Sequence, residues 1–225
     1  MKYILRNTFV IALLIFSTSM FMQKTTHIIF FGDSITQAGV QPNGYITKIG
    51  EALTKKGIAA EYNLTGAGIG GNKIYDLYLR MEDDVLSKNP DVVVIWVGVN
   101  DVWHKSSFGT GTDPDKFEKF YIAIINKLQA KKTRIILCTP STIGEKSDYT
   151  NQQDGDLNRY SQIIRDLARN YHCDLVDFRT IFHLYEQQNN PSNKDRGILT
   201  VDGVHLNDQG NQLVADEMLK VIVEK

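Results

Sequence analysis

The composition of the chain is that of one ordinary globular domain. Of its 225 residues, 42% are hydrophobic and 10% aromatic, which is enough to bury one substantial core. The 25 Lys and Arg residues nearly balance the 26 Asp and Glu residues, without a sustained run of one sign. Nucleic acid is therefore excluded as the expected partner, and a small or neutral molecule is favoured.

The first residues of the chain have the order of a secretory signal. Lys2 and Arg6 form a basic start, the segment 9–16 is apolar, and small residues follow it. This apolar segment is shorter than the about 20 residues that a membrane-spanning helix needs. We therefore expect residues 1–22 to be a signal peptide or, alternatively, an uncleaved anchor, with one domain over residues 23–225. The protein is then exported, periplasmic or extracellular, and meets a membrane only if that segment is retained.

The rest of the chain alternates short β-type runs with longer amphipathic stretches. Strands are predicted over residues 27–31, 59–64, 91–97, 134–138 and 174–178. Helices are predicted over residues 45–56, 117–130, 157–171 and about 207–223. This alternation predicts an α/β fold, in which a parallel sheet with right-handed crossovers lies inside a three-layer α/β/α sandwich. The polar stretch 186–196 is expected to be a solvated loop.

The chain has two cysteines, Cys138 and Cys173. Cys138 closes one predicted strand, whereas Cys173 precedes the next. If these strands are parallel neighbours, the two sulfur atoms lie at opposite ends, beyond disulfide reach. We therefore expect two buried free thiols.

Polar or glycine-rich segments follow the predicted strands. These segments are Gly32–Ser34 after the first strand, the glycine-rich run 66–71 after the second, Gly98–Asp101 after the third, and Asp202–His205 ahead of the last helix. Ligands of parallel α/β sheets bind beyond the carboxyl ends of the strands. A hydroxyl, a glycine-rich backbone, an amide, a carboxylate and an imidazole are thus expected on one rim.

This set of groups is what acyl transfer requires. The Ser34 hydroxyl becomes a nucleophile when a neutral imidazole, that of His205, takes its proton. Asp202 can hold the other ring nitrogen of the imidazole and stabilise the imidazolium. The oxyanion needs preorganised donors, and the Ser34 N–H, a glycine N–H of the second segment and the Asn100 amide are suitable. Asp33 is expected to stabilise the turn and to take no part in catalysis.

The four segments, in this order, resemble the blocks of the SGNH (GDSL) hydrolase family. The resemblance covers nearly the whole chain after the expected signal. It implies a flavodoxin-like sheet of strand order 2-1-3-4-5, no metal or other cofactor, and serine esterase chemistry on a small-molecule or glycan ester. It also implies that Ser34, Gly71 and Asn100 form the oxyanion hole, with Gly68 as the rival glycine, and that Asp202 and His205 complete the triad.

The substrate is expected to be a short, acetyl-like O-acyl ester, and Trp103 and His104 are candidates to line its pocket. A lysophospholipid or other lipid ester is the alternative substrate. An acyltransferase that uses the same acyl-enzyme is a second alternative. A non-catalytic carbohydrate-binding module is disfavoured, because binding requires no such combination of nucleophile, base and amide.

Overall fold

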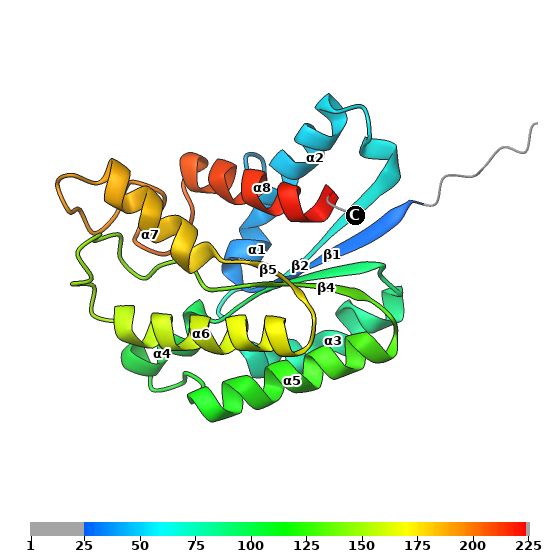
Figure 1. The fold of residues 1–225 in the computed structure, drawn as a ribbon, viewed down its shortest axis with the longest axis horizontal. Helices are drawn as coiled ribbons and strands as arrows, with labels where there is room; N and C mark the ends of the chain where they lie inside the picture. Colours follow the sequence, from blue (N-terminus) through cyan, green and yellow to red (C-terminus); the bar gives the residue numbers. More distant parts are fainter. Residues whose placement is uncertain (1–24, 224–225) are drawn as a thin grey trace, which may run out of the picture.

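The computed structural model describes residues 25–223, which form an α/β/α sandwich around one parallel sheet (Figure 1). The expected signal segment lies outside the described residues. The strands are β1 (Thr26–Gly32), β2 (Tyr62–Gly68), β3 (Val92–Trp96), β4 (Arg134–Cys138) and β5 (Asp174–Val176). Their spatial order is β2-β1-β3-β4-β5, and all neighbours are parallel, so the predicted fold class and strand order are confirmed.

Helices cover both faces of the sheet (Figure 1). One face carries α1 (Ser34–Gly39), α2 (Tyr45–Lys55), α7 (Phe178–Asn189) and α8 (Asp208–Val223). The other face carries α3 (Ile74–Asp84), α5 (Pro114–Ala130) and α6 (Asp154–Asn170), and α4 (Val99–Ser107) follows β3 on that side. Short 3₁₀ turns, Ala59–Glu61 and Leu86–Lys88, precede β2 and β3.

Alternate residues of the central strands build the two halves of the core. In β1, Ile28 and Phe30 pack toward α2 and α8, whereas Ile29 and Phe31 pack toward α3 and α5. Every residue of β3 is buried, as expected for a strand covered on both faces. Trp96 packs in the core, where its indole N–H donates to the Thr139 carbonyl at 3.0 Å. The sheet that carries the site is therefore held by apolar packing on both sides.

Of the predicted solvated loop 186–196, residues 191–196 are a largely exposed loop as expected, whereas residues 186–190 are not. The segment begins inside α7, where Glu186 is only 1% exposed, and Asn190 after the helix is 3% exposed. Phe178, Phe182 and Glu186 recur at intervals of four, so the polar Glu186 lies on the buried face of the helix. The prediction was wrong there because polarity alone does not reveal a buried position within a helix.

The two cysteines are free. Cys138 is buried as predicted, whereas Cys173 is only half-buried. Burial raises the pKa of the Cys173 thiol to about 11 and that of Cys138 well above its ordinary value. Both side chains therefore remain neutral thiols near neutral pH.

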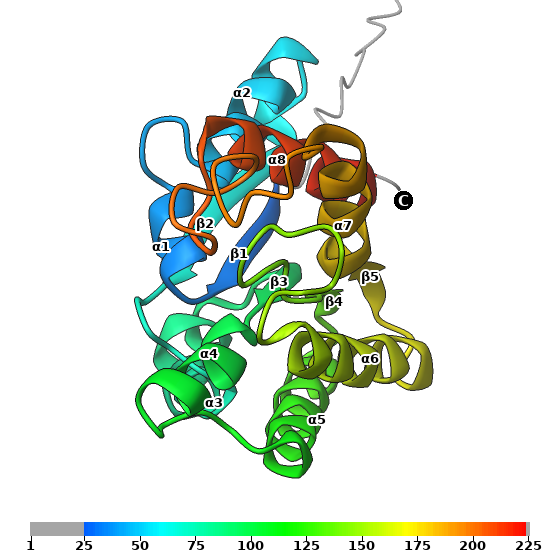
Figure 2. The same cartoon turned by 90° about the vertical axis from the view of Figure 1, so that its left-hand side faces the viewer.

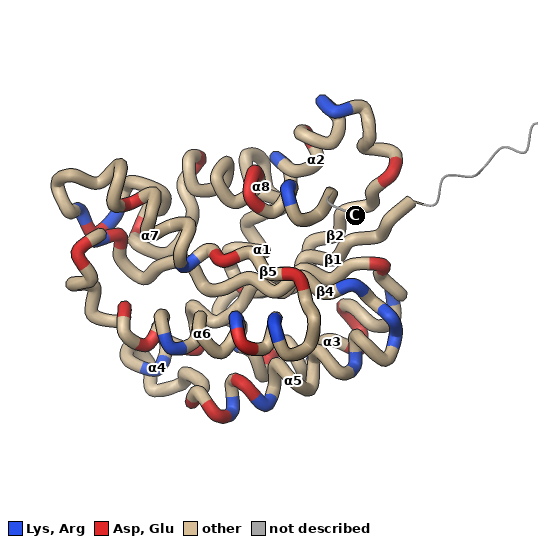
Figure 3. The backbone as a smooth tube through the Cα atoms, in the orientation of Figure 1, with Lys and Arg blue, Asp and Glu red and all other residues tan. Residues whose placement is uncertain are grey.

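Charged residues of both signs are interspersed over the surface (Figure 3). The tube shows Lys and Arg beside Asp and Glu on α5 and α6, in keeping with a net charge of −1. Within residues 25–223, every helix is too short or too polar to cross a bilayer.

Candidate active site

A tight turn at the carboxyl end of β1 presents Ser34. Gly32 is required there, because a Cβ at this position would lie 2.4 Å from the Trp96 carbonyl oxygen. The Asp33 carboxylate accepts a hydrogen bond from the Ile35 N–H at 3.0 Å and so caps α1, which begins at Ser34. This contact fits the turn-stabilising part expected of Asp33. Burial raises the pKa of Asp33 to about 6, although the Ile35 bond opposes the shift.

The imidazole of His205 lies against the Ser34 hydroxyl, although the two residues are 171 positions apart in the chain. The distance from Ser34 Oγ to His205 Nε2 is 3.0 Å, and that from His205 Nδ1 to Asp202 Oδ2 is 2.7 Å. With Nδ1 protonated toward the carboxylate, Nε2 is free to accept the serine proton. The fold thus brings all three predicted triad residues together in the order that proton transfer requires.

The Asp202 carboxylate is held by the segment it precedes. Its Oδ1 accepts hydrogen bonds from the backbone N–H groups of Val204 at 3.0 Å and His205 at 2.8 Å. Partial burial raises the pKa of Asp202, but the His205 ring and these two N–H groups lower it by more, so the net shift is downward. Asp202 therefore stays ionised beside the imidazole in neutral solution.

The predicted oxyanion donors meet at the ends of β1, β2 and β3. Ser34 is the first residue of α1, so its N–H has no acceptor within the helix. In the described part of the chain the Gly71 N–H donates to no other atom. Asn100 is 3% exposed and uses one amide hydrogen to bind the Asn72 carbonyl at 3.1 Å, which leaves the second hydrogen available. Three donors can thus face one developing negative charge.

Gly68 and Gly71, the two candidate oxyanion donors of the second segment, differ in their surroundings. A Cβ on Gly68 would lie 2.1 Å from the Gln37 backbone nitrogen, so this glycine allows the end of β2 to pack closely against α1. Gly71 follows the strand, adopts φ +75°, and precedes α3 near Asn100. Gly70 N–H is already bound to the Gln37 side chain at 2.9 Å. The geometry therefore favours Gly71 as the donor.

Arg80, which the sequence analysis did not single out, links the strand ends that precede the predicted oxyanion donors. Its Nη2 donates to the carbonyls of Gly32 at 2.8 Å and Ala67 at 3.0 Å, at the ends of β1 and β2. Its Nε donates to the Asn72 side chain at 2.7 Å, and the Asn72 carbonyl accepts from Asn100. The sequence analysis predicted no helix over α3, and nothing in the sequence around Arg80 marks it as part of the site.

Asp101 connects the third segment to the second in a similar way. It is fully buried, and its carboxylate accepts the N–H of Ile74, the first residue of α3, at 3.2 Å. Burial raises the pKa of Asp101 to about 7, despite hydrogen bonds that lower it. Asn100 and Asp101 thus have different roles: the Asn100 amide faces the site, and the Asp101 carboxyl binds the start of α3.

An aromatic rim formed by Trp103, His104 and Phe108 lies along α4 and its end. The Trp103 ring is edge-on to His205 with centroids 6.4 Å apart, and His104 packs against Phe108 at 5.0 Å. Burial, with the nearby positive charge of Lys73 as the second cause, lowers the pKa of His104. Trp103 therefore lies next to His205, whereas His104 lies between Trp103 and Phe108, and Phe108 is strongly exposed at 68%.

Within residues 25–223 no group of three or more His, Cys, Asp or Glu side chains is placed to hold a metal ion. The groups that the structure does assemble are a hydroxyl, an imidazole, a carboxylate and amide donors. Ester hydrolysis by an activated serine uses these side chains and backbone groups.

Comparison with known proteins places the chain in a family. Residues 30–213 match the model of the GDSL-like lipase/acylhydrolase family. The chain is 26% identical over 211 residues to an acetylxylan esterase of Geobacillus stearothermophilus, covering 87% of this chain and 93% of that protein. It is 24% identical over 200 residues to an isoamyl acetate-hydrolyzing esterase 1 homolog of Rattus norvegicus, covering 83% and 77% of the two proteins.

Solved structures agree with this placement. The crystal structure of an acetyl xylan esterase, AlAXEase, superimposes with a TM-score of 0.87 at 66% identity, over 88% of this chain and 100% of that one. LAE5, an enzyme from the metagenome of Lake Arreo, Spain, gives a TM-score of 0.78 at 25% identity, over 88% and 94% of the two chains. The chain belongs to the GDSL-like lipase/acylhydrolase family and is a carboxylic ester hydrolase.

Proposed function

We propose that the protein is an exported acetyl esterase that removes acetyl groups from an acetylated glycan of the xylan type, with Ser34 as nucleophile. The observation that carries the catalytic part is the 3.0 Å contact between Ser34 Oγ and His205 Nε2, with Asp202 on the far side of the imidazole. Catalysis by an activated serine requires this chain of contacts, and a structural serine does not.

The reaction proceeds in two halves. His205 takes the hydroxyl proton as Ser34 Oγ attacks the ester carbonyl, and the resulting oxyanion accepts hydrogen bonds from Ser34 N–H, Gly71 N–H and Asn100. The tetrahedral intermediate collapses, the imidazolium gives its proton to the leaving alcohol, and acetyl-Ser34 remains. Water, deprotonated by His205, then attacks the acyl carbonyl and forms a second tetrahedral intermediate. When this intermediate collapses, its bond to Ser34 Oγ breaks, the imidazolium returns its proton to Oγ, and acetate is released.

The choice of substrate is supported by the relatives and by the rim. AlAXEase and the Geobacillus protein are both acetyl xylan esterases, and AlAXEase is 66% identical to this chain. Trp103 lies beside His205, the group that protonates the leaving alcohol in this mechanism, with ring centroids 6.4 Å apart. A flat aromatic ring at that place suits a sugar ring as the alcohol part of the ester.

Export is supported by the substrate and by the order of the N-terminal sequence. Polymeric xylan does not cross a membrane, so an enzyme that acts on it must reach the outside of the cell. The basic and apolar start of the chain is typical of a secretory signal. Fractionation of cells that express the full chain should place it outside the cytoplasm; a purely cytoplasmic product would contradict this part of the proposal.

The decisive experiment compares the parent with Ser34→Ala on para-nitrophenyl acetate, butyrate and octanoate, acetylated xylo-oligosaccharides and lysophosphatidylcholine. We expect the parent to prefer acetyl esters and to release acetate from the oligosaccharides. Ser34→Ala should lose at least about 10³-fold in kcat/KM while it keeps the circular dichroism spectrum. Equal rates for parent and variant would refute the catalytic assignment, and preference for octanoate or lysophosphatidylcholine would replace the glycan with a lipid.

A further inference from the structure

The segment that carries Asp202 and His205 is held by hydrogen bonds as well as by packing. Between α7 and α8 it is irregular, with a single isolated bridge from Thr200 to Leu206, and Leu199 and Val204 within it are buried. The side chains of Asp202 and His205 themselves are 44% and 38% exposed. Because exposed side chains gain little positional restraint from their own burial, the hydrogen bonds that hold the backbone of this segment contribute to the geometry of the base.

The carboxylate of Glu145 supplies those bonds. Glu145 is fully buried in the connection between β4 and α6. Its Oε1 accepts the N–H groups of Leu199 and Thr200, both at 2.6 Å, and its Oε2 accepts the N–H of Ile198 at 2.7 Å. Three consecutive backbone groups, ending two residues before Asp202, are therefore bound to one buried side chain.

Backbone contacts continue the same attachment up to the catalytic residues. The Gly144 N–H donates to the Gly203 carbonyl at 2.8 Å, and the Glu145 N–H donates to the Asp195 carbonyl at 2.9 Å. Gly203 lies directly between Asp202 and Val204. In Figure 2 the β4–α6 connection and the segment before α8 run next to each other above the ends of β1 and β3, in agreement with these bonds.

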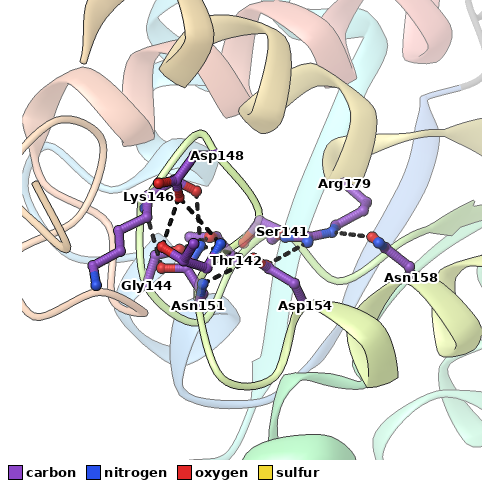
Figure 4. A network of polar contacts seen from close by, with 10 residues as sticks. Ser141, Thr142, Gly144, Lys146, Asp148, Asn151, Asp154, Asn158 and Arg179 are labelled. Carbon is purple, nitrogen blue, oxygen red and sulfur yellow. Dashed lines mark hydrogen bonds and ion pairs between the residues drawn. The ribbon is translucent and has the colours of Figure 1, made fainter. Parts of the chain in front are cut away.

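The β4–α6 connection is itself anchored by a polar network (Figure 4). Asn151 binds the backbone of Lys146 in both directions, through the Lys146 N–H at 3.1 Å and the Lys146 carbonyl at 2.8 Å. Asn151 also donates to Asp154 at 3.0 Å, and Asp154 forms a buried ion pair with Arg179 of α7 at 2.6 Å. Glu145 thus projects from a connection that is held in place independently of the catalytic segment.

We infer that Glu145 is a positioning residue, which sets the distance between the Asp202–His205 pair and Ser34. The inference rests on the proposed triad, to which it adds a residue that holds Asp202 and His205 in place. Glu145 touches no reacting atom and acts only through the segment 198–203. An ionised carboxylate suits this place, because it accepts all three N–H groups, whereas an amide would turn its NH₂ group toward one of them.

A neighbouring carboxyl offers a matched control. Glu186 of α7 is 1% exposed, and its Oε1 has no hydrogen-bond partner within residues 25–223. Burial, with the charge of Glu145 as the second cause, raises the pKa of Glu186 to about 8. Glu186 is therefore neutral at pH 7, and Glu186→Gln replaces a neutral group by one of the same shape without touching the catalytic segment.

The test measures kcat and KM on para-nitrophenyl acetate at pH 7 for Glu145→Gln, Glu145→Asp and Glu186→Gln. We expect both Glu145 variants to lose about 10- to 100-fold in kcat with KM within about twofold, since a displacement near 1 Å suffices for such a loss. Glu186→Gln should keep the parent kcat. Glu145→Asp keeps the charge but falls one methylene short, so it remains informative if Glu145→Gln does not fold.

A double-mutant cycle separates positioning from a general structural defect. In a His205→Ala background the base is already absent, so adding Glu145→Gln should leave the residual rate unchanged within about twofold. A folded Glu145 variant with parent kcat would overturn the inference, and so would an equal loss of rate with and without His205. If His205→Ala alone keeps full activity, the triad is wrong, and that result is distinct from a failure at Glu145.

Discussion

The two halves of the active site are held by different physical means. Ser34 and Asn100 follow the buried central strands β1 and β3, Gly71 follows the partly exposed edge strand β2, and Arg80 binds the ends of β1 and β2. Asp202 and His205 lie on an irregular and partly exposed segment that packs through Leu199 and Val204 and is bound by the Glu145 carboxylate. The nucleophile half therefore depends mainly on the sheet, and the base half depends in addition on a small number of hydrogen bonds.

Because of this difference, a substitution can change the stability of the domain without moving the catalytic groups, or move them without changing that stability. A change in the sheet-bound half should alter the stability of the whole domain when it touches a supporting group, and catalysis alone when it touches a donor. A change in the hydrogen-bonded half can move the base while the core stays intact. Substitutions of three residues test this difference: the donor Asn100, the rim residue Trp103 and the supporting residue Asp101.

The largest effect is expected at the donor. Asn100→Ala should lower kcat by about 10²- to 10³-fold, because the amide stabilises charge that develops only in the transition state. KM should stay close to that of the parent. Steady-state kinetics on para-nitrophenyl acetate, with thermal unfolding as the control for folding, measure both. An unchanged kcat would remove Asn100 from the oxyanion hole.

A smaller effect is expected at the rim, where the base half meets the substrate. Trp103→Ala should raise KM for acetylated xylo-oligosaccharides about 10-fold, since a stacked aromatic ring contributes of the order of 1 kcal/mol. The kinetics on para-nitrophenyl acetate, which lacks a sugar, should change by less than about threefold. Equal effects on the two substrates would show that Trp103 supports His205 instead of binding the alcohol part.

The smallest effect on catalysis is expected at Asp101, the buried support of α3. Its pKa rises from 3.8 unfolded to about 7 folded, so the folded protein holds this proton more tightly. The contribution to the free energy of unfolding is therefore full below pH 3.8 and decreases as the pH rises toward 7, by up to about 1.4 kcal/mol per pH unit. Asp101→Asn should flatten that decline between pH 4 and pH 7, as followed by urea unfolding. A parallel decline in the variant would show that another group is responsible.

The sequence predicted five parallel strands, although β2 covers residues 62–68 instead of the predicted 59–64, and it singled out the side chains that the structure brings together at the candidate site. Apolar runs and their alternation with helices predict the strands, and the four segments after them supply Ser34, Asn100 and His205. The supporting groups were not predictable, because nothing near Glu145 or Arg80 in the sequence marks them. Their partners are mostly backbone atoms, which carry no residue-specific pattern. The three that bind Glu145 lie 53 to 55 residues away from it, and Arg80 reaches Gly32, which lies 48 residues away. Glu186 was misplaced for the related reason that a buried carboxyl looks like any surface carboxyl.

The separation of Ser34 and His205 by 171 positions has a consequence for biosynthesis. Synthesis proceeds from the N-terminus, so the hydroxyl emerges from the ribosome long before its proton acceptor. A polypeptide that ends before residue 205 lacks the imidazole that contacts Ser34 in the folded protein, so the proposed triad cannot form until synthesis has passed that residue. On the proposed mechanism, the protein can hydrolyse esters only after the segment ahead of α8 has docked. Folding of the C-terminal part is therefore required before the enzyme is active.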